Sequence, residues 1–177
     1  PKGLAAATGM DALTHAIEGY ITKGAWALTD TLTLKSIEML AKSLKKACDG
    51  DSDAKNDMGI AQYVAGMAFS NVGLGIVHSM AHPLGAFYDT PHGVANALLL
   101  PYVMEYNADS TGEKYMHIAK AFGAENACNL PPSEYRKAAV DAVRNLAISL
   151  DIPQKLSQIG VKESDLEHLA QAAFRDV

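Results

Sequence analysis

The sequence predicts an all-α domain, and three observations lead to that prediction. Apolar residues recur at intervals of three and four over long stretches, which is the period of an amphipathic helix. No stretch alternates apolar and polar residues as a half-buried strand would, and no hairpin signal occurs. Glycine and proline fall between the periodic stretches, where they would end helices. With 177 residues, 49% of them hydrophobic, the chain is long enough for one domain with a real core.

The first two helices are expected at about 8–22 and 29–49. Thr8 is a candidate N-cap for the first, and Gly50 is a stop signal for the second, after a group of lysines that suits a helix C-terminus. The apolar faces of these helices comprise Met10, Leu13, Ile17 and Ile21 in the first, and Leu32, Ile37, Leu40 and Leu44 in the second.

A long segment from about 53 to 82 is rich in small residues and apolar nearly all round. That pattern predicts a central helix covered by other helices on every side. Pro83 and Gly85 are expected to end it, and Thr90 is expected to cap a new helix with Pro91 in its first position. Further helices are predicted at about 111–122, 132–150 and 162–175, separated by Gly123, Pro131, Pro132 and Pro153.

Charge and composition exclude several classes of protein. The formal net charge is −5 and the pI about 5.6, and no basic stretch suggests a nucleic-acid partner. No unbroken apolar run is long enough to predict a membrane span. Cys48 and Cys128 are far apart and predict buried or surface thiols in a cytoplasmic protein rather than a disulfide framework. The chain lacks an initiator methionine and ends within a helical pattern, so we expect a piece of a longer protein.

Residues 76–93, IVHSMAHPLGAFYDTPHG, hold three of the six histidines. His78 and His82 are four residues apart and would share one face of a helix. A buried imidazole without a polar partner costs about 1–3 kcal/mol, so these rings either find partners in the core or converge on a ligand. His92 begins the next predicted helix, and the intervening loop is long enough to bring it back beside its predecessor.

Asp11 and His15 form a second pair with the same spacing, and a carboxylate and an imidazole so placed can share one metal ion. A structural interpretation of Asp11 is also open, because Thr8-x-x-Asp11 resembles a capping box and an acid suits the first turn of a helix.

Five groups could therefore build a metal site, and three imidazoles with one carboxylate would suit Fe²⁺ or Zn²⁺. Spacing alone does not show which histidine is left over; beside an open metal position it could relay a proton or contact substrate. Glu18 raises the alternative of a carboxylate-bridged di-iron site, but the 53–82 segment supplies no further glutamate. The five groups are Asp11, His15, His78, His82 and His92.

Other residues of interest carry weaker signals. Phe69 and Asn71 precede His78 by two to three turns and either line the same cavity or fill the core. His117 and His168 lie in charged, amphipathic stretches and are expected to be solvated. The Gly-Leu-Gly at 73–75 does not match a dinucleotide-binding fingerprint, because no strand precedes it and no third glycine follows.

Two long stretches, GMDALTHAIEGYIT and VAGMAFSNVGLGIVHSMAHPLGAFYDTPHGVANALLLPYVMEYNA, resemble the iron-containing (group III) alcohol dehydrogenases. The resemblance covers essentially the whole chain. It implies that residues 1–177 are the single helical, bundle-like, metal-binding C-terminal domain of a two-domain, dehydroquinate synthase-like fold. The family's N-terminal nucleotide-binding domain, with its GGGS loop, and its last helix have no counterpart in this sequence. The chain by itself is therefore expected to be inactive, since half of the cofactor cleft would be missing.

The resemblance also implies roles for particular residues. The metal ligands would be Asp11 and His15 of the DALTH motif, the first histidine of HSMAH, His78, and the histidine of PHG, His92. The remaining group, His82, would lie near the nicotinamide and the substrate, as a catalytic and cofactor-binding residue. Phe69 matches a position that lines the substrate cavity.

The activity implied by the resemblance is an NAD(H)-linked oxidoreduction that uses Fe²⁺, or Zn²⁺, and interconverts a small aldehyde and a primary alcohol. The wording HPLGAFYDTPHG favours the branch that acts on lactaldehyde and 1,2-propanediol; ethanol, butanol and 1,3-propanediol are the alternatives within the family. The whole protein is expected to be a homo-oligomer. The hypothesis from another class is a non-catalytic helical interaction module whose histidines are satisfied in the core.

Overall fold

The computed structural model describes residues 1–176, which form eight α-helices, four short 3₁₀ helices and no strand, so the all-α fold class is confirmed. The α-helices are α1 (Lys2–Ile21), α2 (Ala27–Cys48), α3 (Ser52–Val72), α4 (Ile76–Tyr88), α5 (His92–Asn107), α6 (Lys114–Ala121), α7 (Pro132–Ser149) and α8 (Leu166–Phe174). The three C-terminal helices therefore lie within a few residues of their predicted positions.

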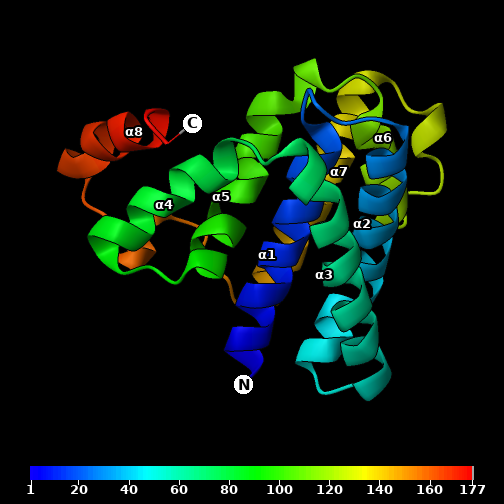
Figure 1. Ribbon diagram of the computed structural model, residues 1–177, viewed down its shortest axis with the longest axis horizontal. Helices are drawn as coiled ribbons and strands as arrows, with labels where there is room; N and C mark the ends of the chain where they lie inside the picture. Colours follow the sequence, from blue (N-terminus) through cyan, green and yellow to red (C-terminus); the bar gives the residue numbers. More distant parts are fainter. Residues whose placement is uncertain (177) are drawn as a thin grey trace.

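The central helix is α1. It runs through the middle of the molecule with α2 and α3 on one side and α4 and α5 on the other (Figure 1). Met10, Leu13 and Ile17 on its apolar face are fully buried. Alanine and glycine supply much of the rest of its surface, so neighbouring helices can approach it closely on several sides.

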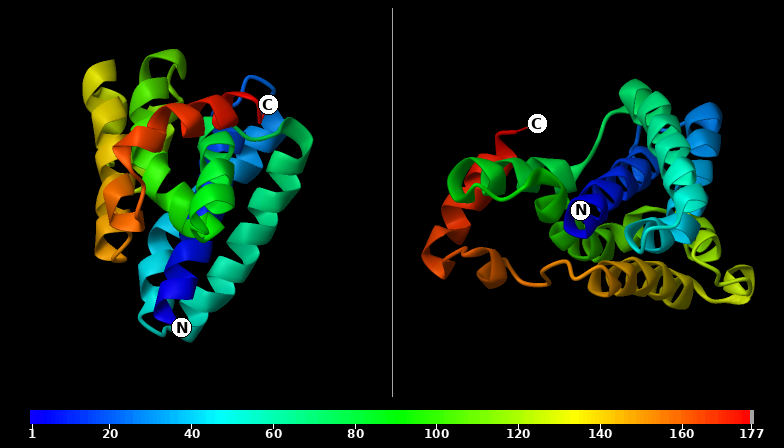
Figure 2. Two further views of the ribbon diagram at one scale, coloured as in Figure 1. Left: turned by 90° about the vertical axis from the view of Figure 1, so that its left-hand side faces the viewer. Right: turned by 90° about the horizontal axis from the view of Figure 1, so that it is seen from below.

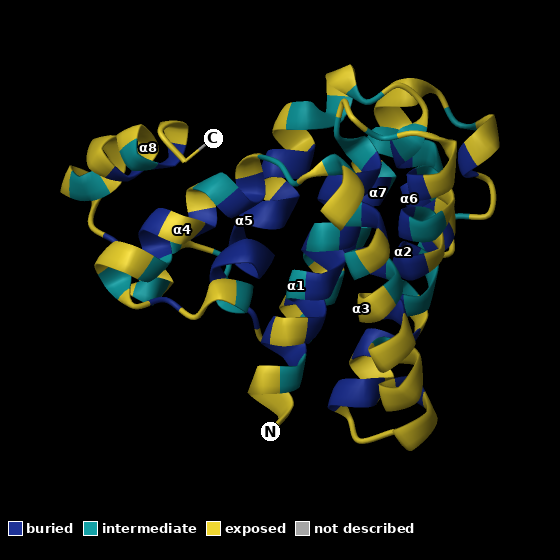
Figure 3. Ribbon diagram, viewed as in Figure 1, coloured by how far each residue is buried: buried dark blue, intermediate teal, exposed yellow. Residues whose placement is uncertain are grey.

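The prediction of one central helix over 53–82 is wrong. The segment divides into α3 and α4, whose axes differ by 104°. The break falls at Gly73, where φ is +80°, a backbone conformation that glycine adopts without the steric cost of a Cβ atom. Four alanines make up the buried face of α3 and its outer face is exposed, so α3 is not covered on every side (Figure 3).

Three predicted helix boundaries are also wrong. Pro83 and Gly85 lie inside α4, which continues to Tyr88. Thr8 lies inside α1, where its hydroxyl donates to the carbonyl of Leu4 at 2.9 Å; the helix starts earlier because good helix formers precede Thr8, so neither an N-cap nor a capping box with Asp11 forms. Pro91, not Thr90, is the N-cap of α5.

The remaining helices extend the core away from α1. Ile37, Leu40 and Leu44 of α2 are buried, as their spacing predicted. α7 packs on α5 and α6, and α8 lies along α4 at the far end of the molecule (Figure 2). Of the two cysteines, Cys48 is buried and Cys128 exposed, and both are free thiols.

Among residues 1–176, no single helix is long and apolar enough to cross a membrane, and only the bent pair of α3 and α4 meets that criterion of length and composition.

Candidate metal centre

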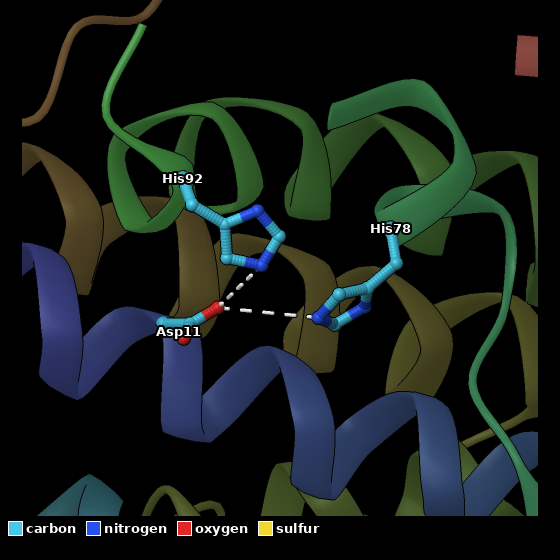
Figure 4. Close-up of side chains that lie close together, drawn as sticks. All are labelled: Asp11, His78 and His92. Atoms are coloured by element: carbon cyan, nitrogen blue, oxygen red, sulfur yellow. Dashed lines mark ion pairs between the residues drawn. The ribbon is translucent and has the colours of Figure 1, made fainter. Parts of the chain in front are cut away.

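Three side chains from three helices converge beside the middle of α1 (Figure 4). Asp11 lies on α1, His78 in the first turn of α4, and His92 at the first position of α5. One ligand atom from each lies within 4.8 Å of the other two. Oδ1 of Asp11 is 3.5 Å from Nε2 of His92 and 4.0 Å from Nε2 of His78. The packing of α5 on α1 and of α4 on α5 thus unites residues separated by up to 81 positions in the sequence.

His15 lies one turn after Asp11 on the same face of α1. Its ring centroid is 4.3 Å from that of His78, and its Nδ1 is 3.6 Å from Oδ1 of Asp11. The three-residue cluster of converging ligand atoms does not include it. The Nδ1 of His15 donates to the backbone carbonyl of Asp11 at 2.8 Å, so its Nε2 carries the lone pair.

A buried carboxylate orients His78. Glu18 is 2% exposed and accepts from Nδ1 of His78 at 2.7 Å. The same carboxylate accepts from the backbone N–H groups of Val77 at 2.7 Å and Gly75 at 3.0 Å, so it also holds the beginning of α4. A Cβ atom on Gly75 would be 2.7 Å from Oε1 of Glu18, so a side chain at residue 75 would disturb this contact. Since Nδ1 of His78 donates, its Nε2 carries a lone pair toward Asp11.

A close contact between backbones places His92. A Cβ atom built on Gly93 would be 2.4 Å from the carbonyl oxygen of Ala7 on α1. The first turn of α5 therefore lies directly against α1, one turn before Asp11, and only glycine permits this approach.

His82, one turn after His78, stays outside the three-residue cluster. Its side chain is 53% exposed, and its ring is stacked on that of His92 with 5.6 Å between centroids. Its Nδ1 donates to the carboxylate of Asp176, which follows α8, and Ser79 donates to the backbone carbonyl of the same residue at 3.3 Å. This contact fixes the ring and leaves Nε2 of His82 with its lone pair.

Burial affects the protonation of two of the imidazoles. Desolvation lowers the pKa of His15 and the pKa of His92 from the ordinary value of 6.5, although the Asp11 carboxylate opposes both shifts. The neutral form, which is the form that binds a metal, is therefore favoured at both positions near neutral pH.

A cleft of about 660 Å³ opens beside these residues, between α1 and α3. Asp11, His15 and Phe69 line it, and the ring centroids of Phe69 and His15 are 4.5 Å apart. Asn71 does not line this cleft: it is exposed, and its Nδ2 donates to the carbonyl of Met67 in its own helix at 2.7 Å.

The two histidines expected to be solvated differ. His168 is exposed and its ring lies against Phe87, with 4.7 Å between centroids. His117 is half-buried and its Nδ1 is 2.7 Å from the hydroxyl of Tyr20, so the expectation of a solvated ring is wrong for His117. The charged sequence of α6 did not indicate that one face of this helix packs against the core.

The donor set suits a borderline divalent metal. One carboxylate oxygen and two imidazole nitrogens already converge, and the lone pair on Nε2 of His15 provides a further nitrogen donor nearby. Fe²⁺ and Zn²⁺ both accept this mixture of oxygen and nitrogen. Glu18 is hydrogen-bonded to His78 and two backbone groups instead of sharing the cluster with Asp11, so no pair of bridging carboxylates forms there.

Sequence reasoning missed two polar groups around this centre, Asn96 and Asp176, and considered Glu18 only as a bridging carboxylate. Glu18 lies on the Asp11 face of α1, so its spacing from Asp11 and His15 could have revealed its role. Asn96, one turn after His92, donates from Nδ2 to Oδ1 of Asp11 at 2.7 Å. Asp176 carried no signal, because only the packing of α8 on α4 brings it to His82.

Comparison with known proteins agrees with this architecture. The profile described as the Fe-containing alcohol dehydrogenase family, C-terminal, matches residues 5–177. Lactaldehyde reductase of Escherichia coli K12 is 60% identical over 100% of this chain, and 1,3-propanediol dehydrogenase of Klebsiella pneumoniae is 46% identical over 99% of it. Each match covers 46% of the relative, so the chain spans about half the length of these proteins.

Solved structures agree as well. A crystal structure of a 1,3-propanediol oxidoreductase superimposes with a TM-score of 0.95 at 45% identity, and an alcohol dehydrogenase from Oenococcus oeni with 0.96 at 38%. Both alignments cover 99% of this chain and 46% of the other. The match along residues 5–177 and the shared helical architecture show that this chain belongs to the iron-containing alcohol dehydrogenase family and corresponds to its C-terminal region.

Proposed function

We propose that the whole protein is a metal-dependent, NAD(H)-linked oxidoreductase that interconverts a small aldehyde and its primary alcohol, with lactaldehyde and 1,2-propanediol as the preferred pair. The convergence of Asp11, His78 and His92 from three helices carries the proposal. The identity of 60% to a lactaldehyde reductase over the full chain supports the substrate pair.

We assign the metal to Asp11, His15, His78 and His92. Bound there, Fe²⁺ or Zn²⁺ would supply a Lewis acid for the carbonyl, and NAD(H) would supply the hydride chemistry. Asp11 contributes the negative charge of the set. Glu18 holds His78 so that its Nε2 faces the centre, and the hydrogen bond from Nδ1 of His15 to the backbone of α1 leaves Nε2 of His15 as the nitrogen that can bind.

His82 is the residue that we place next to the reacting atoms. Its Nδ1 is held by Asp176, so its Nε2 is the atom that can hold or release a proton, and its exposed ring borders His92. Phe69 forms an apolar wall of the cleft beside His15, and we propose that it contacts the carbon chain of the substrate, whereas Asn71 is turned away from the cleft.

This chain would supply the metal and substrate half of the site, and a nucleotide-binding domain elsewhere in the whole protein would supply the cofactor half. The isolated 177-residue chain should then show no nicotinamide-dependent turnover. A cytoplasmic homo-oligomer remains our proposal for the whole protein, with the two free thiols in support of a reducing compartment.

Elemental analysis tests the metal assignment. The whole protein, purified without oxygen or chelator, should contain about one iron or zinc per chain, and a His78→Ala, His92→Ala double variant should lose both metal and turnover. His82→Ala should keep the metal and lose turnover. A His82→Ala protein that loses its metal would show that the ligand assignment is wrong.

Activity assays test the substrate. Turnover of lactaldehyde should exceed that of acetaldehyde, butanal and 3-hydroxypropanal at matched concentrations. A preference for 3-hydroxypropanal would move the assignment to 1,3-propanediol, which the 46% identity to a 1,3-propanediol dehydrogenase makes the second candidate. A correctly folded wild-type protein without metal and without turnover would instead favour a helical interaction module.

A further inference from the structure

Asn96 occupies a distinctive position under the candidate metal centre. It lies on α5 one turn after His92 and is fully buried. Its Nδ2 is 2.7 Å from Oδ1 of Asp11, 3.0 Å from Nε2 of His92 and 3.1 Å from Nε2 of His78. One amide nitrogen therefore contacts the converging atom of each residue in the cluster.

The carboxylate of Asp11 determines which way this amide points. The reverse orientation would place Oδ1 of Asn96 2.7 Å from a carboxylate oxygen, with two acceptors in contact and no hydrogen between them. With the nitrogen toward the cluster, Oδ1 of Asn96 is buried and has no hydrogen-bond partner among the described residues. An unpaired buried carbonyl carries a desolvation penalty, so this arrangement is not one that core packing alone would favour.

The amide nitrogen can only donate, and this restricts the imidazoles around it. The amide has two hydrogens, and Asp11 accepts one of them at 2.7 Å. The second is directed to Nε2 of His92, the nearer of the two imidazole nitrogens, so this ring must accept and carry its own hydrogen on Nδ1. For His78 the contact with Glu18 already enforces that tautomer. For His92, Asn96 is the hydrogen-bond partner that the described structure provides.

Without Asn96 a different contact would be favoured. Nε2 of His92 is 3.5 Å from Oδ1 of Asp11, so a small movement would let a hydrogen on Nε2 bond the carboxylate directly. That bond would occupy Oδ1 of Asp11 and Nε2 of His92, the two atoms that would otherwise bind the metal. Asn96 prevents it by donating to both partners.

We propose that Asn96 is a positioning residue of the metal centre: its amide donates to Asp11 and His92, keeps the Nε2 lone pair of His92 directed into the site, and prevents these two residues from pairing with each other. The inference rests on the proposed metal-dependent function but concerns a residue outside its ligand set. Loss of the amide should weaken metal binding by about 10- to 100-fold, the usual effect of removing a group that orients a ligand.

The first experiment needs no metal. Nitrogen-15 correlation spectra of the metal-free whole protein, at a pH where the imidazoles are neutral, report which ring nitrogen carries the hydrogen. Wild-type His78 and His92 should both carry it on Nδ1. In Asn96→Leu, His92 should change to Nε2–H, while His78 should keep Nδ1–H because Glu18 still accepts from it. Asn96→Ala repeats the test with a smaller side chain.

The second experiment measures the dissociation constant of Co²⁺ from its visible absorption. Asn96→Leu should bind about 10- to 100-fold more weakly with an unchanged spectrum. Met104→Ala, which truncates a buried residue two turns further along α5, should bind as wild type does. A changed spectrum would mean that Asn96 is itself a ligand and would overturn the positioning role, as would equal losses in both variants.

The two experiments separate this inference from the proposed function. Wild-type protein that binds no Co²⁺ but shows the Asn96-dependent tautomer of His92 would refute the metal site and retain the hydrogen-bonding role. Wild-type His92 with its hydrogen on Nε2 would overturn the inference whatever the variants do, and leave the metal assignment standing.

Discussion

Glu18 and His78, sixty residues apart in the sequence, form a buried hydrogen bond of 2.7 Å between a carboxylate oxygen and Nδ1. Glu18 lies on the central helix and His78 at the beginning of α4. The carboxylate also accepts from two backbone groups at the break between α3 and α4. One side chain thus fixes both the turn of the chain and the direction of a candidate metal ligand.

Replacing Glu18 should therefore affect stability and metal binding together. Glu18→Ala leaves two buried donors and one part-buried donor without an acceptor, and we expect the free energy of unfolding to fall by at least about 3 kcal/mol. Urea denaturation followed by circular dichroism measures this. Glu38→Ala, which removes a surface carboxylate paired with Lys35, is the matched control and should change stability by less than about 1 kcal/mol. Similar losses in the two variants would contradict the role of Glu18.

Gly93→Ala tests the close approach of α5 to α1. The added Cβ would meet the carbonyl oxygen of Ala7 at 2.4 Å, and a backbone atom cannot move aside as a flexible side chain can. We expect a loss of about 1–3 kcal/mol in stability and weaker metal binding, because His92 is displaced from Asp11. Gly66→Ala in α3 meets nothing within 4 Å and should leave stability unchanged or raise it by up to about 1 kcal/mol. Thermal unfolding of both variants, with and without metal, distinguishes the two effects.

Asp176→Asn tests how His82 is held. The amide is neutral, so it accepts from Nδ1 of His82 more weakly than the carboxylate does. The ring of His82 should then lose its fixed orientation. We expect turnover to fall, by less than the roughly 10²- to 10⁴-fold loss expected for His82→Ala, with metal content unchanged in both. Steady-state kinetics and elemental analysis on the same preparations measure these quantities. Normal turnover in Asp176→Asn would show that the contact with Asp176 is structural only.

The lowered pKa values of His15 and His92 predict how stability depends on pH. In the metal-free protein, the unfolded chain takes up protons near pH 6.5, above the pKa of either residue in the folded state. The unfolded state therefore binds more protons in this window, and the free energy of unfolding should decrease as the pH falls below 6.5. Well above pH 6.5, where both residues are neutral in the folded and the unfolded state, they should have no effect on how the free energy of unfolding changes with pH.

Urea unfolding at several values between about pH 5 and about pH 7 measures this dependence. His15→Gln and His92→Gln should each reduce the slope below pH 6.5, because each removes one group whose proton uptake differs between the two states. His168→Gln removes an exposed histidine outside the centre and is the control. Equal slopes in all three variants and the wild type would argue against lowered pKa values at His15 and His92 in the folded state.

Local sequence patterns were sufficient to predict the fold class and to propose the candidate ligands. Helical periodicity is a local property, so the all-α prediction and the buried faces of α1 and α2 followed from spacing alone. The motifs around Asp11, His15, His78 and His92 identified the family for the same reason, since each is a short run of neighbouring residues.

The position of the turn between α3 and α4, and the groups that support the centre, depend on contacts between residues far apart in the sequence. Just after the break between α3 and α4, Glu18 accepts from Gly75 and Val77, a contact across more than fifty residues that helical periodicity cannot reveal. Asn96 and Asp176 likewise acquire their roles from helices that approach one another in space. Periodicity indicates which face of a helix is buried, whereas the residues that this face contacts depend on how the helices pack.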